Sequence, residues 1–271
     1  MARHNASLTS LALAALLLVT APAHAGRSCE ARKPTPQLIE RGMQLAQQTA
    51  AALDAEHARS GTRVVVLGRA GQDLGQYGLR YSHLGWAYRT DAGPWRVLHK
   101  LNECGSAVGH LYRQGLGEFF LDDLWRYEAV WAVPTHEVQQ RLLPVLEDGA
   151  RVRLLQHTPY SMVSYAWGRK YQQSNQWALE TLALAMEPDS VRTRDQAQAW
   201  LQFKGYVPSV LKIGALTRLG GRMGSANIAF DDHPSEQRFA DCIETVTVDS
   251  VLAWLQRAQL ASRPVVFSVK Y

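Results

Sequence analysis

Three side chains have the types that acyl-transfer chemistry requires: His83, His99 and Ser174. His83 begins one segment rich in bulky and β-branched residues, and His99 lies near the end of the next such segment. Residues 90–94 between them, Thr-Asp-Ala-Gly-Pro, are typical of a hairpin turn. We therefore expect the two imidazoles on adjacent strands, where His83 is a general base and the second ring fixes its tautomer.

Two polar residues that follow His99 are alternatives for this orienting role. Asn102 and Glu103 come directly after the second strand segment. A partner on one ring nitrogen of the base decides which nitrogen carries the proton, so either residue satisfies the same requirement. The sequence does not choose between them and His99.

The nucleophile is expected at a helix N-terminus, because the helix dipole and the free N–H groups stabilise a developing anion. Ser174 is the only hydroxyl at the start of the most apolar helical segment, residues 174–186. Asn175 and Gln176 follow it and, together with Asn102, are candidates for lining a binding pocket.

Each of these residues also has an ordinary structural interpretation. A strand histidine such as His83 can be hydrogen-bonded in the core, and strand alternation can turn His99 outward. Ser174 can be a helix N-cap, since serine is favoured at that position. Both interpretations stay open at the level of the sequence.

The periodicity of apolar residues predicts an α+β fold in a single domain. Thr35 and Pro36 are typical of a helix start, and apolar residues then recur at three- and four-residue steps as far as Leu53. The order is one helix, then mostly strands, then mostly helices, which favours an antiparallel sheet with packed helices. Further helices are predicted at 135–147, 174–186, 194–204 and 247–256, and strands at 63–69, 83–89, 95–101, 127–133 and 264–271.

The N-terminus has the pattern of a secretion signal. Residues 8–19 are an uncharged, apolar run, and Ala23-His24-Ala25 offers the small residues that signal peptidase requires. Cleavage after Ala25 leaves 246 residues that begin at Gly26. The apolar run is too short to span a bilayer. We therefore expect a periplasmic or secreted protein that does not span the membrane.

In an exported protein the three cysteines can form a disulfide, because disulfides persist in oxidising compartments. Cys29, Cys104 and Cys242 allow three pairings with one thiol left over. We favour a Cys29–Cys104 disulfide, since it would hold the mature N-terminus.

Several chemistries are excluded by absent motifs and by charge. The sequence has no phosphate-binding loop, no dinucleotide fingerprint, no His-Glu-x-x-His and no Gly-x-Ser-x-Gly. Residues 231–234, Asp-Asp-His-Pro, are more typical of a turn than of a metal site. The net charge is +5, too small to indicate nucleic acid. We therefore expect no cofactor, no metal and no nucleic acid.

Several short runs resemble a family of exported bacterial proteins that is a domain of unknown function. The runs are residues 69–73, 77–85, 101–105, 174–177 and 230–234. More distantly, Ser82-His83-Leu-Gly followed by His99 resembles the circularly permuted NlpC-type papain-like enzymes. That resemblance implies His83 as base, His99 as the orienting residue and a helix start at Ser174-Asn175, where those enzymes have a cysteine that this chain lacks.

Two functions follow from these observations. The first is an envelope hydrolase or acyl/amide transferase in which Ser174 attacks a carbonyl and His83 accepts its proton. The alternative is a noncatalytic papain-like envelope protein that binds a lipid, peptide or glycan. Lys204, Lys212, Arg218 and Arg222 gather near an expected loop at 214–224. They form either a solvated face or a patch for an acidic ligand. The oligomeric state is not predicted.

Overall fold

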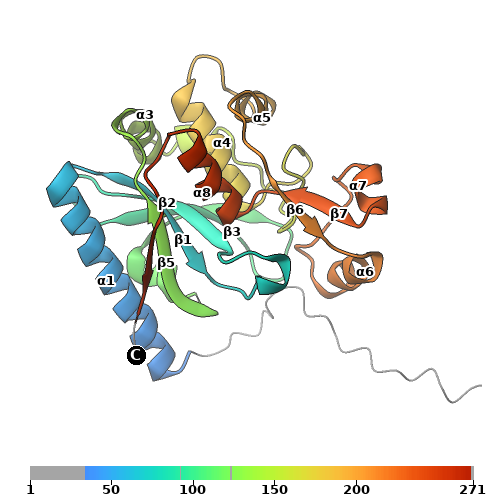
Figure 1. Ribbon diagram of the computed structural model, residues 1–271, viewed down its shortest axis with the longest axis horizontal. Helices are drawn as coiled ribbons and strands as arrows, with labels where there is room; N and C mark the ends of the chain where they lie inside the picture. The colour runs from blue at the N-terminus through green and yellow to red at the C-terminus, as the bar shows by residue number, and fades with distance from the viewer. Residues whose placement is uncertain (1–33, 92, 123, 270–271) are drawn as a thin grey trace, which may run out of the picture.

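A six-stranded antiparallel sheet forms the centre of the protein (Figure 1). The computed structural model describes residues 34–91, 93–122 and 124–269. The strands lie in the order β4-β3-β2-β1-β5-β8. Their bounds are β1 Val64–Ala70, β2 His83–Tyr88, β3 Arg96–Asn102, β4 Gly109–Gly115, β5 Arg126–Ala132 and β8 Val265–Ser268. The predicted α+β architecture with an antiparallel sheet is confirmed.

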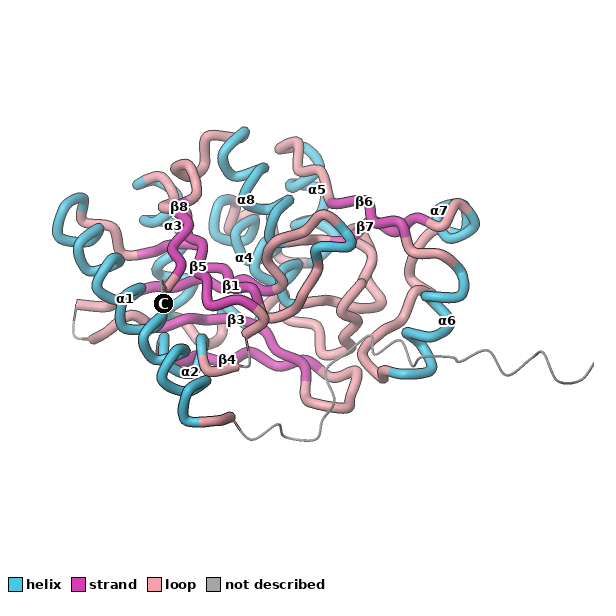
Figure 2. The backbone as a smooth tube through the Cα atoms, turned by 60° about the horizontal axis from the view of Figure 1, so that its bottom comes forward, coloured by secondary structure: helices cyan, strands magenta, loops and turns pink. Residues whose placement is uncertain are grey.

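Helices cover both faces of this sheet (Figure 2). Successive side chains of a strand point to opposite faces, so neighbouring residues of β1 enter different hydrophobic clusters. Val65 and Leu67 pack with α1 (Pro36–Ser60) and α2 (Leu116–Phe120). Val64 and Val66 pack in the cluster of the opposite face. The helices of that face are α3 (His136–Glu147), α4 (Ser174–Met186), α5 (Arg194–Phe203) and α8 (Val248–Arg257).

Helix α1 starts and ends at residues whose chemistry suits those positions. The Thr35 hydroxyl accepts a hydrogen bond from the Leu38 N–H, and proline occupies the first helical position. Gly61 ends the helix with φ 73°, in the left-handed region that glycine adopts without strain. The predicted start of this helix is therefore confirmed.

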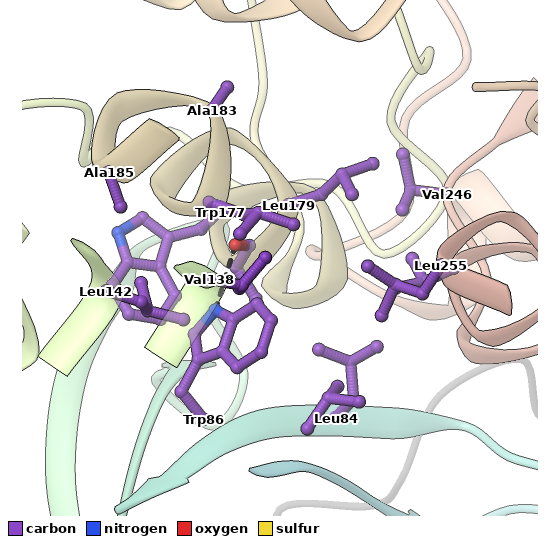
Figure 3. Close-up of a cluster of buried hydrophobic side chains, with 14 of the residues drawn as sticks. Leu84, Trp86, Val138, Leu142, Trp177, Leu179, Ala183, Ala185, Val246 and Leu255 are labelled. Carbon is purple, nitrogen blue, oxygen red and sulfur yellow. Dashed lines mark hydrogen bonds between the residues drawn. The ribbon is translucent and has the colours of Figure 1, made fainter. Parts of the chain in front are cut away.

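Helix α4 is the central helix of the protein, because every one of its residues is buried. Figure 3 shows Trp177 and Leu179 of α4 against Leu84 and Trp86 of β2. The indole Nε1 of Trp86 donates to the Ala178 carbonyl at 3.0 Å. Strand β2 and the first turns of α4 are thus joined by both packing and a buried hydrogen bond.

A small second sheet extends one end of the protein. It pairs β6 (Ser209–Lys212) with β7 (Cys242–Thr245) and carries α6 (Ala215–Gly224) and α7 (Ser235–Phe239). The expected loop at 214–224 is therefore wrong, because most of this segment is helical. Single 3₁₀ turns occur at η1 (Gly75–Tyr77) and η2 (Arg151–Arg153).

Two features expected from the N-terminal sequence lie outside the described residues. These are the signal peptide and Cys29, so the Cys29–Cys104 disulfide stays a prediction. Cys242 is a free cysteine. Within the described ranges, no helix has the length and hydropathy needed to span a bilayer.

Candidate functional site

The structure brings His83 and His99 into direct contact. Nε2 of His83 lies 2.8 Å from Nδ1 of His99, and Nε2 of His99 lies 2.8 Å from Oε1 of Gln114. Because the Gln114 side-chain oxygen accepts a hydrogen bond from the N–H of His99 Nε2, His99 Nδ1 is left to accept a hydrogen bond from the N–H of His83 Nε2. The three side chains, on β2, β3 and β4, therefore form one hydrogen-bonded chain.

Glycine is required beside this pair. A Cβ atom at Gly85 would lie 2.9 Å from the Cβ of His99 and 2.8 Å from Cγ1 of Val97. Any larger residue in β2 at this point would push β3 away and separate the two imidazoles. Close packing of β2 against β3 thus explains the glycine in the sequence Ser-His-Leu-Gly.

Phe119 and Arg69 cover the two histidines on the face of the sheet where α2 lies. The Phe119 ring lies 5.9 Å from the His83 ring and 5.3 Å from the His99 ring, between centroids. Arg69 faces His83 across the β1–β2 pairing and stacks over Phe119, and its guanidinium donates to the Phe119 carbonyl and the Asp122 carboxylate. The histidines are therefore enclosed within the protein, next to a buried cation.

Burial and this cation keep both histidines neutral. Burial, followed by the charge of Arg69, lowers the pKa of His83 well below its ordinary value. The same two causes lower the pKa of His99 to about 3, although Gln114 and Asp122 oppose the shift. Neutral rings at physiological pH are consistent with either a hydrogen-bonded core pair or a base.

Ser174 lies on the other face of the sheet from this pair. It begins α4, and α4 packs against Leu84, the residue next to His83 in β2. Since adjacent strand residues point to opposite faces, the His83 ring points away from α4. The Ser174 hydroxyl instead contacts the Tyr160 hydroxyl at 3.3 Å. The structure therefore does not assemble the Ser174–His83 pair that the serine mechanism requires.

Asn175 and Gln176 hold α4 in place. The Asn175 side chain accepts from the Leu84 N–H at 3.0 Å and donates to the Val246 carbonyl at 3.3 Å. Gln176 accepts from the Ser164 hydroxyl and donates to two backbone carbonyls of the preceding loop. Both amides are buried with their oxygen and nitrogen atoms in use.

Asn102 and Glu103 do not orient the histidines. Three positions separate Asn102 from His99 in β3, so the two side chains point to opposite faces of the sheet. The Asn102 amide donates to the backbone carbonyl of Glu103 at 3.1 Å, and the Glu103 carboxylate lies 2.9 Å from His110 Nε2. Gln114, which hydrogen-bonds to His99, has the orienting role that was expected of Asn102 or Glu103.

Lys100 is a buried residue that the sequence analysis did not single out. Its ammonium donates to the His157 carbonyl at 2.5 Å, the Gln172 carbonyl at 2.8 Å and the Gln172 side-chain oxygen at 2.9 Å. Burial, followed by the charge of Arg194, lowers the pKa of Lys100 to about 7, although the charge of Glu180 opposes the shift. Lys100 thereby fastens the loop before α4 to the α4 face of the sheet.

Glu180 extends this network into α4. Its fully buried carboxylate accepts from Gln172 at 2.5 Å, from Arg194 at 2.9 and 3.1 Å, and from Gln198 at 2.9 Å. The sequence feature that could have indicated a buried ion pair is this single charged residue in an apolar helix. Lys100 and Glu180 both hydrogen-bond to the Gln172 side chain, which thereby links β3 to α4.

The turn at residues 231–234 is also held by internal hydrogen bonds. Asp232 accepts from the Tyr165 N–H at 2.8 Å, and His233 Nε2 lies 2.7 Å from the Val163 carbonyl. Among the residues described, no three His, Cys, Asp or Glu side chains are grouped to hold a metal ion.

Fold and site together define an α+β protein whose sheet buries a histidine pair on one face and a wholly buried helix on the other. The chain belongs to the bacterial family described as "Uncharacterized protein conserved in bacteria (DUF2145)", whose model matches residues 56–255. Neither a curated protein nor a solved structure matches the chain. The resemblance to the permuted papain-like fold stays a prediction.

Proposed function

We propose that this chain is an exported envelope protein that binds a lipid, peptide or glycan without cleaving it. The observation that carries this proposal is the closed start of α4. Ser174, Asn175 and Gln176 are buried, and their side chains contact other groups of the protein. A papain-like enzyme needs a reactive group at this point with a base beside it, whereas here the Ser174 hydroxyl contacts the Tyr160 hydroxyl and the two amides position the helix.

The serine hydrolase or acyltransferase is the less supported alternative. It requires a proton to pass from Ser174 to His83, which lies on the opposite side of the sheet behind β2. Proton transfer between nucleophile and base needs heavy atoms within about 2.6–3.2 Å, or one water between them. Rotation of the Ser174 or His83 side chain cannot bring the two groups together, because the sheet lies between them.

Labelling with an active-site serine probe tests the proposal. We expect a fluorophosphonate to leave Ser174 unmodified in the native protein, because its hydroxyl is buried and lacks a base. Peptide mass spectrometry of the wild type, Ser174→Ala and His83→Ala reads out the result, with a known serine hydrolase as the positive control. Modification of Ser174 that disappears in both variants would establish the enzyme and refute the noncatalytic role.

A further inference from the structure

Helix α6 exposes its apolar side chains to solvent. Leu216, Leu219 and Met223 recur at three- and four-residue steps, and they are 85%, 55% and 81% exposed. With 3.6 residues per turn, these positions share one side of the helix, roughly opposite Gly221. Gly221 is the buried residue of α6, so the helix rests on its glycine side and turns its apolar side outward.

Helix α7 adds an aromatic side chain to the same surface. Phe239 is 88% exposed, and with Leu219 it lines a groove of about 310 Å³ between α6 and α7. We define the α6–α7 surface as Leu216, Leu219, Met223 and Phe239 together with the arginines of the groove. Four large apolar side chains that lie close together and are exposed by more than half indicate an interaction site.

Arginines give this surface its charge. Arg218, Arg222 and Arg238 line the groove. Arg218 also pairs with Asp241 at 3.0 Å, whereas Nε of Arg238 is buried without a hydrogen-bond partner. Residues 214–224 contain two arginines and no acidic residue. Asp241 and Glu236, which is exposed in the first turn of α7, are carboxylates that oppose this charge.

We propose that the α6–α7 surface docks onto an anionic phospholipid membrane. A short helix with an exposed apolar side and flanking arginines is the arrangement that lies in a bilayer interface. Leu216, Met223 and Phe239 enter the acyl region, and Arg222 and Arg238 contact lipid phosphates. This inference rests on the proposed noncatalytic role. Of the three ligand classes named there, lipid, peptide and glycan, it selects lipid.

The position of α6 favours a membrane over a small ligand. Helix α6 lies at the end of the protein opposite α1, and Figures 1 and 2 agree on this placement. Two of its apolar side chains are more than four-fifths exposed, so they project away from the groove. A ligand confined to the groove would leave them in water, whereas a bilayer surface covers them as well as the groove.

Co-sedimentation with vesicles tests this inference. Protein is expressed from the complete sequence, and its N-terminus is determined by mass spectrometry, because an uncleaved apolar leader would itself bind lipid. We expect binding to phosphatidylcholine vesicles containing 30% phosphatidylglycerol that is about ten-fold or more tighter than binding to pure phosphatidylcholine. Added salt should weaken this binding, since it screens the charge of the exposed Arg222.

Variants locate the binding surface. Met223→Asp and Phe239→Ser should each weaken binding about ten-fold or more, and Arg222→Gln should weaken it about five-fold. The matched control is Phe203→Ser at the end of α5, because Phe203 is 83% exposed but lies outside the surface. This control should bind vesicles as the wild type does.

Three outcomes would overturn the docking proposal. They are binding that is equal on both vesicle types, binding that Phe203→Ser weakens as much as Phe239→Ser, and a concentration-dependent dimer that Met223→Asp abolishes. The last result, measured by sedimentation velocity without lipid, would assign the surface to a second copy of the chain. None of them affects the serine-labelling result, so a failure here is distinct from a failure of the noncatalytic role.

Discussion

Replacing Arg194 with methionine is expected to lower the free energy of unfolding by about 3–5 kcal/mol. Arg194 donates to both oxygens of the Glu180 carboxylate, and Glu180 is fully buried in α4. Removing the guanidinium leaves the buried carboxylate without its ion-pair partner, and the two glutamine amides carry no charge to replace it. Urea unfolding followed by tryptophan fluorescence measures the change.

A neighbouring ion pair supplies the control for this prediction. Arg169 pairs with Asp195 at 3.0 Å, but both side chains are more than half exposed. Arg169→Met should therefore change the free energy of unfolding by less than about 1 kcal/mol. The Arg194→Met effect should shrink when Glu180→Leu is added, since the unpaired charge is then removed. Equal effects of Arg194→Met and Arg169→Met would contradict the buried network.

The buried histidine pair should make the protein acid-sensitive. The pKa of His83 is lowered well below 6.5, and that of His99 is lowered to about 3. Between about pH 3 and pH 6.5, His99 binds a proton in the unfolded chain but not in the folded protein. The same holds for His83 below pH 6.5. Unfolding therefore takes up protons, and the free energy of unfolding falls as the pH falls below 6.5. The expected slope is about 1.4 kcal/mol per pH unit for each histidine.

Urea unfolding between pH 7.5 and 5.0 measures this dependence while most carboxylates stay ionised. The double variant His83→Leu/His99→Leu should lose the part of the slope that these two histidines contribute. Burial also lowers the pKa of His157 and of His233, so a smaller slope should remain. His136→Gln, at the exposed first position of α3, is the control that removes a histidine without touching the pair. A wild-type stability that does not change over this range would contradict burial of two neutral imidazoles. An unchanged slope in the double variant would do the same.

Local chemistry in the sequence was sufficient to predict most of the fold. Helix α4 runs from Ser174 to Met186 as its apolar composition indicated, and Thr35 caps α1 as expected. The hairpin of β2 and β3 places His83 next to His99 at the distance of a hydrogen bond. These features depend on caps, turns and periodicity within a few residues, which a sequence records directly.

The face of the sheet on which the histidines lie could not be predicted. Strand β3 carries His99 and Lys100 in succession, so one of them must face α4 and the other α2. Nothing local decides between them, because a buried lysine depends on acceptors such as Gln172, which lies 72 residues away. The structure places Lys100 towards α4, and it places His99 with His83 on the other face, away from Ser174.

Helix α6 was missed for a different reason. Four glycines within residues 214–224 favour a loop by intrinsic propensity, although Leu216, Leu219 and Met223 have helical spacing. One of these glycines, Gly221, is the residue that packs against the protein. The functional consequence is large, since the expected loop is the helix that carries the proposed membrane surface.

The most direct test of the closed start of α4 is the reactivity of a thiol introduced by Ser174→Cys. Iodoacetamide at pH 6 should leave this thiol unmodified in the folded protein, because Ser174 is 4% exposed and no histidine lies beside it. Peptide mass spectrometry should show full modification only after unfolding, with or without His83→Ala. Rapid modification of the native variant that requires His83 would contradict the account, because it would place a working base next to residue 174.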